Sequence, residues 1–162
     1  MPATTQKITT FLTYESRAEE AATFYVSLFK HSKIVSVSRY GDNQPLPKGT
    51  VLTVAFELDG QRFVALNAGA QFQGKFSDAM SLSVDCETQA EIDELWDKLI
   101  ADGGSPVACG WLHDRFGVSW QIVPREMGEL IGSADPARAN RVMQAMMKMV
   151  KLDIAALKRA AE

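Results

Sequence analysis

The sequence has little of what builds a disulfide scaffold, a membrane span or a polyanion-binding surface. Its two cysteines, Cys86 and Cys109, are too few for a disulfide framework, and nothing in the sequence pairs them. No run approaches the roughly 18 apolar residues of a membrane span, and the start, MPATTQKITT, shows no signal peptide. The formal net charge is -3, whereas nucleic-acid-binding chains usually have a basic face. We therefore expect a cytoplasmic protein without nucleic-acid or membrane partners.

Common catalytic signatures are also missing. The sequence contains no P-loop, no C-x-x-C and no Ser-His-Asp order. Its two histidines, His31 and His113, are far apart along the chain, and we expect structural or surface roles for both. Asp114 and Gly117 have the positions of a turn, which Asp starts and Gly closes. Sequence motifs alone therefore indicate no catalytic residue.

What the sequence does contain is a pattern of strands and helices that occurs twice. In the first half, residues 7–13 are rich in β-branched and aromatic side chains and predict a strand. Ser16 then opens S-R-A-E, which predicts a capping box with Glu19 at the start of a helix. Asp59-Gly60 predicts a hairpin turn. Three further strands are predicted, at residues 34–40, 51–58 and 62–67.

The second half repeats this order. Residues 80–85 predict a strand, and Thr88 opens a second capping box, T-Q-A-E, which Glu91 closes. A helical stripe of apolar residues follows and ends at Gly103-Gly104. Three short strands are then predicted, at residues 106–109, 111–114 and 119–123. Because the two capping boxes stand at matching places in the same order of elements, the sequence predicts a duplicated βαβββ module.

Residues 125–162 are predicted to be helical. Asp135 precedes Pro136, which is typical of an N-cap followed by proline at the first helical position, and Asp153 is a second candidate cap. An apolar stripe follows the first of these caps: Val142, Met143, Met146, Met147 and Val150. Since methionine is an adaptable core filler, we expect this stripe to pack on the sheet or on a partner subunit. A methionine-lined ligand groove is the alternative.

Three segments of the chain resemble one protein family. The run CGWLHDRFGVSWQIVP at residues 109–124 resembles the signature of the PhnB-like (3-demethylubiquinone-9 3-methyltransferase-like) branch of the vicinal-oxygen-chelate superfamily. That superfamily includes glyoxalase I, extradiol dioxygenases and fosfomycin-resistance proteins. Residues 11–29 resemble the family's first strand and helix, and residues 135–160 resemble its C-terminal extension.

The resemblance implies an α+β fold in which two βαβββ modules form a curved mixed sheet, a glyoxalase-like cup. We expect this domain at residues 1–124, with modules at about 1–68 and 79–124, and a helical extension at 125–162. The resemblance also implies a homodimer, with the methionine stripe as a candidate interface. We do not expect methyl transfer despite the family's name. S-adenosylmethionine-dependent enzymes commonly have a parallel α/β pattern with a Gly-rich turn, and no G-x-G occurs here.

Metal-binding members of the superfamily carry His, Gln or Glu on the first and last strands of each module. Matched by motif, these positions fall on or near Thr10, Asn67, Ser81 and Gln121. None of the four is His, Glu or Asp, and neutral oxygens give Zn²⁺ or Fe²⁺ no charge compensation. We therefore predict no metal and no cofactor, with a divalent metal as the alternative.

The resemblance also implies that the side chains at these four positions face the inside of the cup. Alternation along the last strand places Gln121 on one face with Ser119 and Val123, and Trp120 on the other face with Ile122, under a helix. The predicted ligand-binding residues are Thr10, Asn67, Phe72, Ser81, Cys109, Trp111 and Gln121. Such a lining suits a small polar-aromatic ligand. The alternative is that these polar side chains bond only to one another or to water.

These observations predict a metal-free, small-molecule binding protein of the superfamily. An enzyme of the glyoxalase, isomerase or dioxygenase kind, using a divalent metal or side-chain acid–base groups, is the second hypothesis. Cys109 would be a nucleophile only if its thiolate were stabilised; otherwise it is a small apolar side chain. The sequence leaves open whether the protein is an enzyme.

Overall fold

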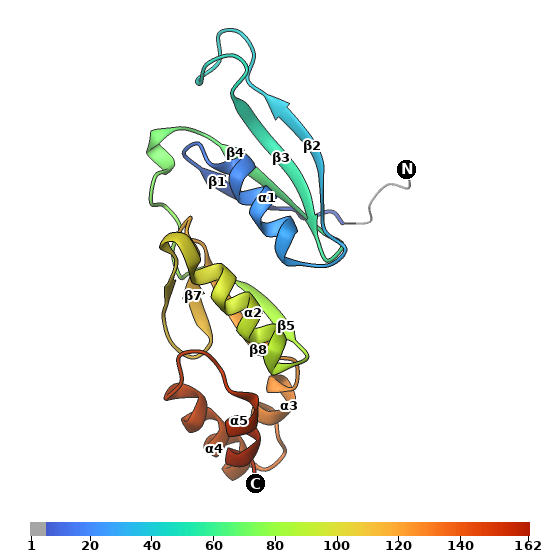
Figure 1. Ribbon diagram of the computed structural model, residues 1–162, viewed down its shortest axis with the longest axis vertical. Helices are drawn as coiled ribbons and strands as arrows, with labels where there is room; N and C mark the ends of the chain where they lie inside the picture. Colours follow the sequence, from blue (N-terminus) through green and yellow to red (C-terminus); the bar gives the residue numbers. More distant parts are fainter. Residues whose placement is uncertain (1–5) are drawn as a thin grey trace. The chain divides into compact units, whose positions relative to one another are not determined.

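A computed structural model describes residues 6–162, which form two compact units with their boundary between Lys75 and Phe76 (Figure 1). Unit 1 ends at Lys75 and unit 2 starts at Phe76. Unit 1 contains β1 (Thr10–Tyr14), α1 (Ala18–Leu28), β2 (Lys33–Arg39), β3 (Val51–Leu58), β4 (Gln61–Asn67) and a short 3-10 helix (Ala70–Phe72). Unit 2 contains β5 (Leu82–Cys86), α2 (Gln89–Ile100), a 3-10 turn (Ala101–Gly103), β6 (Ser105–Pro106), β7 (Trp111–His113), β8 (Ser119–Pro124), α3 (Met127–Ile131), α4 (Pro136–Met147) and α5 (Ile154–Ala160).

The two units have the same sheet topology. Unit 1 has the strand order β1-β4-β3-β2, and unit 2 has the equivalent order β5-β8-β7-β6. In each sheet the first strand pairs in parallel with the last, and the other pairs are antiparallel. The predicted α+β fold with duplicated βαβββ modules is therefore confirmed.

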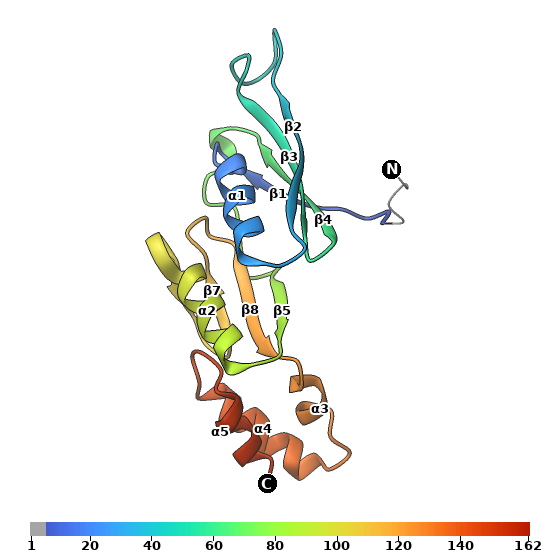
Figure 2. The ribbon, with the colours of Figure 1, turned by 45° about the vertical axis from the view of Figure 1, so that its right-hand side comes forward.

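In unit 1, α1 covers one face of the sheet (Figure 2). Strand alternation sends Leu12 and Tyr14 from β1 to this face, where both are buried. Tyr25 of α1 lies 6.2 Å from Phe56, and Phe56 stacks on Phe63 at 5.6 Å, as measured between ring centroids. These aromatic contacts join the helix to the two central strands.

The two predicted capping boxes have different outcomes. The box at Ser16 is wrong, because α1 begins at Ala18 after Arg17, with no cap from a neighbouring side chain. Its first N–H instead donates to Asn67 Oδ1 of β4 at 2.9 Å. The box at Thr88 is confirmed, since Thr88 Oγ1 accepts from the Glu91 N–H at 3.1 Å.

Unit 2 is built in the same way around α2. The helix buries Ile92, Leu95, Trp96 and Leu99 against Leu112, Trp120 and Ile122 of the sheet. Between β7 and β8 the chain turns at Asp114, as predicted, and the Gly117 N–H donates to the Asp114 carbonyl. The buried Asp114 carboxylate also accepts from the Phe116 and Val118 N–H groups and from Trp120 Nε1. This carboxylate ties the turn to the aromatic core.

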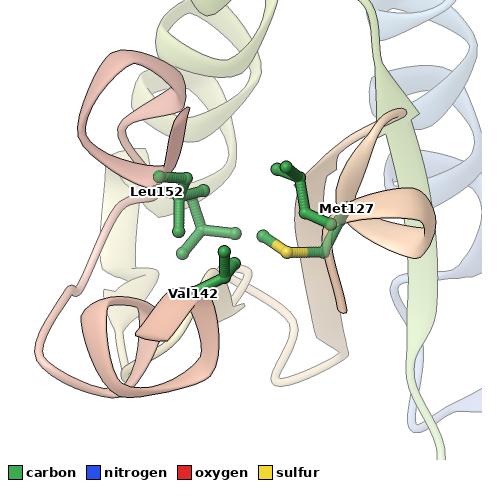
Figure 3. Packing of buried hydrophobic residues seen from close by; sticks show 5 residues of the cluster. Met127, Val142 and Leu152 are labelled. Carbon is green, nitrogen blue, oxygen red and sulfur yellow. The ribbon is translucent and has the colours of Figure 1, made fainter. Parts of the chain in front are cut away.

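The three C-terminal helices follow β8 and have their own apolar cluster (Figure 3). Asp135 and Asp153 cap α4 and α5 as predicted, each accepting a backbone N–H bond at 3.0 Å. The buried cluster consists of Met127, Leu130, Val142, Leu152 and Leu157. The predicted domain boundary at residue 124 is a change from strand to helix, and residues 125–162 belong to the same compact unit as β5–β8.

Only part of the predicted apolar stripe at the C-terminal part of α4 packs inside unit 2. Val142 and Met146 join the cluster of the C-terminal helices, together with Val123 of β8. Met147 and Val150, in contrast, are exposed. None of the helices within residues 6–162 is long and apolar enough to cross a membrane.

Candidate ligand-binding face

In unit 1, the predicted site residues of β1 and β4 lie on the face that α1 covers. Thr10 pairs with Phe63 and Tyr14 pairs with Asn67, so Thr10 and Asn67 stand at opposite ends of the β1–β4 ladder. Alternation places both on the same face as the buried Leu12. The structure therefore does not bring Thr10 and Asn67 together.

Both polar atoms of the Asn67 side chain make hydrogen bonds within unit 1. It is 2% exposed, and besides accepting from the Ala18 N–H it donates from Nδ2 to the Val51 carbonyl at 3.1 Å. Its own carbonyl accepts from the Tyr40 hydroxyl at 2.6 Å. These contacts account for a buried amide without any ligand. Phe72, the third predicted residue of unit 1, is half-buried in the short helix after β4.

In unit 2, three predicted residues come together on the sheet face opposite α2. Trp111 of β7 lies directly across from Gln121 of β8, and Ser83 of β5 lies on the other side of Gln121. Gln121 Nε2 donates to Ser81 Oγ at 2.9 Å. Trp111, Gln121 and Ser81 are half-buried, whereas Ser83 is exposed. We call this group of four side chains the polar face of unit 2.

Cys109 lies in the loop before this face. It has a left-handed backbone with φ of 56°, and its N–H donates to the Met149 carbonyl at 2.9 Å. The adjacent Gly110 N–H donates to the Val150 carbonyl at 2.8 Å. The Cys109 backbone thus attaches the loop to the segment after α4.

Sequence reasoning missed a second polar group beside the polar face. His113 of β7 lies opposite Ser119 of β8, one step along the same face from Trp111 and Gln121. His113 Nε2 lies 2.6 Å from Asp78 Oδ1, and the Ser119 hydroxyl donates to the same oxygen at 2.5 Å. Hydrogen bonds from Ser119 and His113 lower the pKa of Asp78 below its ordinary value.

A signal for part of this group was present in the sequence. Alternation along residues 111–114 places His113 on the face of Trp111, and alternation along 119–123 places Ser119 with Gln121. Nothing in the sequence indicates that Asp78, 35 residues before His113, joins them. Its position depends on the loop that precedes β5.

The residues present do not fit the divalent metal that the superfamily implies. Within residues 6–162, no three or more His, Cys, Asp or Glu side chains are placed to hold a metal ion. Gln121 and Ser81 supply only an uncharged amide and an uncharged hydroxyl. Asp78 and His113 are two possible ligands, whereas a metal site usually has three or four. Metal-free binding therefore stays a prediction that the donor chemistry favours.

Comparison with known proteins places this geometry in a family. Residues 6–123 match the family model described as 3-demethylubiquinone-9 3-methyltransferase. A solved PhnB protein from Bacillus cereus is 45% identical, with a TM-score of 0.66, over 73% of this chain and 99% of that chain. No curated protein matches the chain.

More distant solved structures share the fold alone. A protein from Pseudomonas aeruginosa is 19% identical, with a TM-score of 0.60, over 74% of this chain and 98% of that chain. The fosfomycin resistance protein FosX of Listeria monocytogenes, solved with Mn(II) and sulfate, is 10% identical, with a TM-score of 0.53. That match covers 82% of this chain and 99% of FosX.

Proposed function

The chain belongs to the 3-demethylubiquinone-9 3-methyltransferase family, the PhnB-like branch of the vicinal-oxygen-chelate superfamily, and we propose that it is a metal-free small-molecule binding protein. The polar face of unit 2 carries this proposal. Half-buried polar and aromatic side chains stand in direct register there, on the sheet face that α2 leaves uncovered. This is the kind of lining that fixes a small ligand.

The chemistry of the polar face defines the ligand class. Gln121 uses its Nε2 to hold Ser81, and its Oε1 has no hydrogen-bond partner within residues 6–162. This oxygen is therefore an acceptor for a ligand O–H or N–H group. The Trp111 indole beside it offers a flat apolar surface. A small ring compound with a polar hydrogen suits both groups.

Methyl transfer, which the family's name mentions, is not part of the proposal. Each sheet here has a single parallel strand pair, whereas the usual S-adenosylmethionine-binding domain has a parallel sheet with a Gly-rich turn. We expect calorimetry to detect no binding of S-adenosylmethionine. Stoichiometric binding of that compound would contradict this part of the proposal.

A thermal-shift screen of small polar-aromatic compounds tests the proposal, on protein treated with a chelator. We expect Gln121→Ala and Trp111→Ala to abolish the stabilisation by a hit compound, because each removes one of its contacts. Gln73→Ala, at an exposed glutamine of unit 1, is the control and should keep the full shift. Unchanged shifts in both variants, or stoichiometric Zn, Mn or Fe in the untreated protein, would contradict the proposal.

We further propose that the protein works as a homodimer in the cytoplasm. Met147, the last residue of α4, and Val150, three residues after it, remain 65% and 48% exposed. A second copy is the occupant that the family resemblance implies. Cys86 and Cys109 are both free thiols, which suits a reducing compartment. Light scattering should give the mass of two chains, and Met147→Lys should shift the protein toward one. A monomeric wild type would contradict the dimer.

A further inference from the structure

The Asp78–His113 pair has the form of a fixed proton acceptor. Its Nε2···Oδ1 distance of 2.6 Å is that of a strong, charge-assisted hydrogen bond. The lowered pKa of Asp78 keeps its carboxylate ionised at neutral pH. An ionised carboxylate only accepts hydrogen bonds, so Nε2 of His113 carries a hydrogen, and in the Nε2–H tautomer Nδ1 is the acceptor nitrogen.

Nδ1 is the ring nitrogen of His113 that does not contact Asp78. It has no hydrogen-bond partner within residues 6–162, and the side chain is 36% exposed. His113 lies next to Trp111 along β7, about 7 Å away by strand geometry, and on the same face as Gln121. A ligand of one ring can therefore touch the indole, the Gln121 amide and the imidazole together.

The position of Ser119 excludes catalysis by a serine nucleophile. Its hydroxyl donates to Asp78 and not to His113, and the residue is 1% exposed. A serine nucleophile needs its proton on the histidine and its oxygen open to the substrate. Ser119 therefore orients the carboxylate, and the group does not act as a hydrolytic triad.

We propose that His113 is a proton acceptor for the bound ligand, and that the ligand carries an ionisable hydroxyl on an unsaturated carbon, as in a phenol or an enol. The O–H proton of the ligand moves to Nδ1, which leaves a phenolate or enolate beside an imidazolium. The Asp78 carboxylate stabilises that imidazolium, and the proton stays on Nδ1 while the ligand is bound. Asp78 is a positioning residue in this scheme. The proposal rests on the proposed function, because it needs the ligand on the polar face.

The test uses 4-nitrophenol as the probe and the full chain with ¹⁵N-labelled histidine. Only His31 and His113 give signals, and His31→Gln assigns them. At a pH below the probe's own pKa, we expect saturation to convert His113 to the imidazolium ¹⁵N pattern, while His31 stays unchanged. The visible absorbance of the probe should rise by one phenolate per chain. A neutral His113 in the saturated complex would overturn the proposal.

Two variants separate proton transfer from binding. His113→Gln should bind the probe as the neutral phenol, with complete loss of the phenolate absorbance. Asp78→Asn should lose the single Nε2–H tautomer of free His113 as well as the phenolate, whereas Asp85→Asn should match the wild type. Asp85 is an exposed carboxylate on β5 without a hydrogen-bond partner within residues 6–162. Full phenolate absorbance in Asp78→Asn or His113→Gln would contradict the assignment.

The outcomes also separate this inference from the proposed function. If 4-nitrophenol binds in a Gln121-dependent way but stays neutral, the proton acceptor is wrong and the binding function stands. If wild type does not bind 4-nitrophenol, the phenol–enol ligand class is wrong and the inference falls with it. A different, Gln121-dependent hit in the thermal-shift screen would then still support the binding function.

Discussion

Units 1 and 2 share one topology but differ in the sheet face opposite their helix. At matching ladder positions, unit 1 has Phe11, Val64 and Ala55, and unit 2 has Ser83, Gln121 and Trp111. At these three positions unit 1 is thus apolar and unit 2 is polar-aromatic. The same backbone module carries two different sets of side chains there, and at these positions only unit 2 offers side-chain hydrogen bonds to a small molecule.

The two units also differ in how the start of the helix is stabilised. Unit 1 places Asn67 under α1, where its amide replaces a local cap for the helix. Unit 2 caps α2 locally with Thr88, and Pro124 stands at the ladder position of Asn67. A helix start can therefore be stabilised from within the chain segment or from a strand 49 residues away.

The largest expected effect concerns the C-terminal cluster, which has no counterpart in unit 1. Leu152 is fully buried there and also lies against Gly110. Leu152→Ala should lower the free energy of unfolding by about 3–4 kcal/mol, because it removes apolar contacts and leaves a cavity. Chemical denaturation measures this change. Ile8→Ala, at an exposed position of unit 1, should stay within about 0.5 kcal/mol, and equal losses in both variants would contradict the cluster's role.

A smaller loss is expected when the long-range cap of unit 1 is removed. Asn67→Ala removes the hydrogen bonds to the buried Ala18 N–H and to the Val51 carbonyl. The free energy of unfolding should fall by about 2–3 kcal/mol, as is usual for unsatisfied buried groups. Ligand binding at unit 2 should be unaffected, because Asn67 is not on the polar face. A loss of binding with full stability would give Asn67 back its predicted role.

Substitutions at the two predicted local caps should change stability by less than Asn67→Ala does. Thr88→Ala removes the bond to the Glu91 N–H and should cost about 1 kcal/mol of stability. Ser16→Ala should change the unfolding midpoint very little, since Ser16 does not cap α1. Parallel denaturation curves of the two variants measure the difference. A destabilisation by Ser16→Ala equal to that by Thr88→Ala would restore the first capping box.

The smallest expected effect is the acid dependence of the Asp78 contacts. Because the pKa of Asp78 is lowered in the folded state, its ionised form stabilises the fold above the ordinary value of 3.8. That contribution disappears as the pH falls below this value toward the folded-state pKa. Wild type should therefore exceed Asp78→Asn in thermal midpoint at neutral pH and converge with it in acid. A constant difference from neutral pH into acid would refute the contribution of the ionised carboxylate.

Local patterns in the sequence predicted the elements well and the site only in part. The strand at residues 51–58 and the Thr88 cap are set by neighbouring residues, and both are confirmed. Motif matching assigned the fourth-strand position of the site to Asn67. In the structure, the residue of unit 1 that occupies the position equivalent to Gln121 of unit 2 is Val64. A shift of this size changes the face of the sheet, because side chains alternate.

The other contacts that the sequence did not predict join segments that are distant along the chain. Asn67 caps α1 from another strand, and Asp78 joins His113 and Ser119 from a loop. Neither contact has a local sequence signature, since both depend on how the strands pair. β-strand pairing brings such residues together, and a single sequence does not specify it position by position.

One calorimetric titration tests the central claim most directly. The compound that most stabilises the chelator-treated wild type is titrated into wild type and into Gln121→Val. This substitution gives unit 2 a valine, as unit 1 has at the equivalent ladder position with Val64. We expect one site per chain in the wild type, without added metal, and no detectable binding in Gln121→Val. Equal affinity in both proteins, or binding that needs a divalent metal, would contradict a metal-free site on the polar face of unit 2.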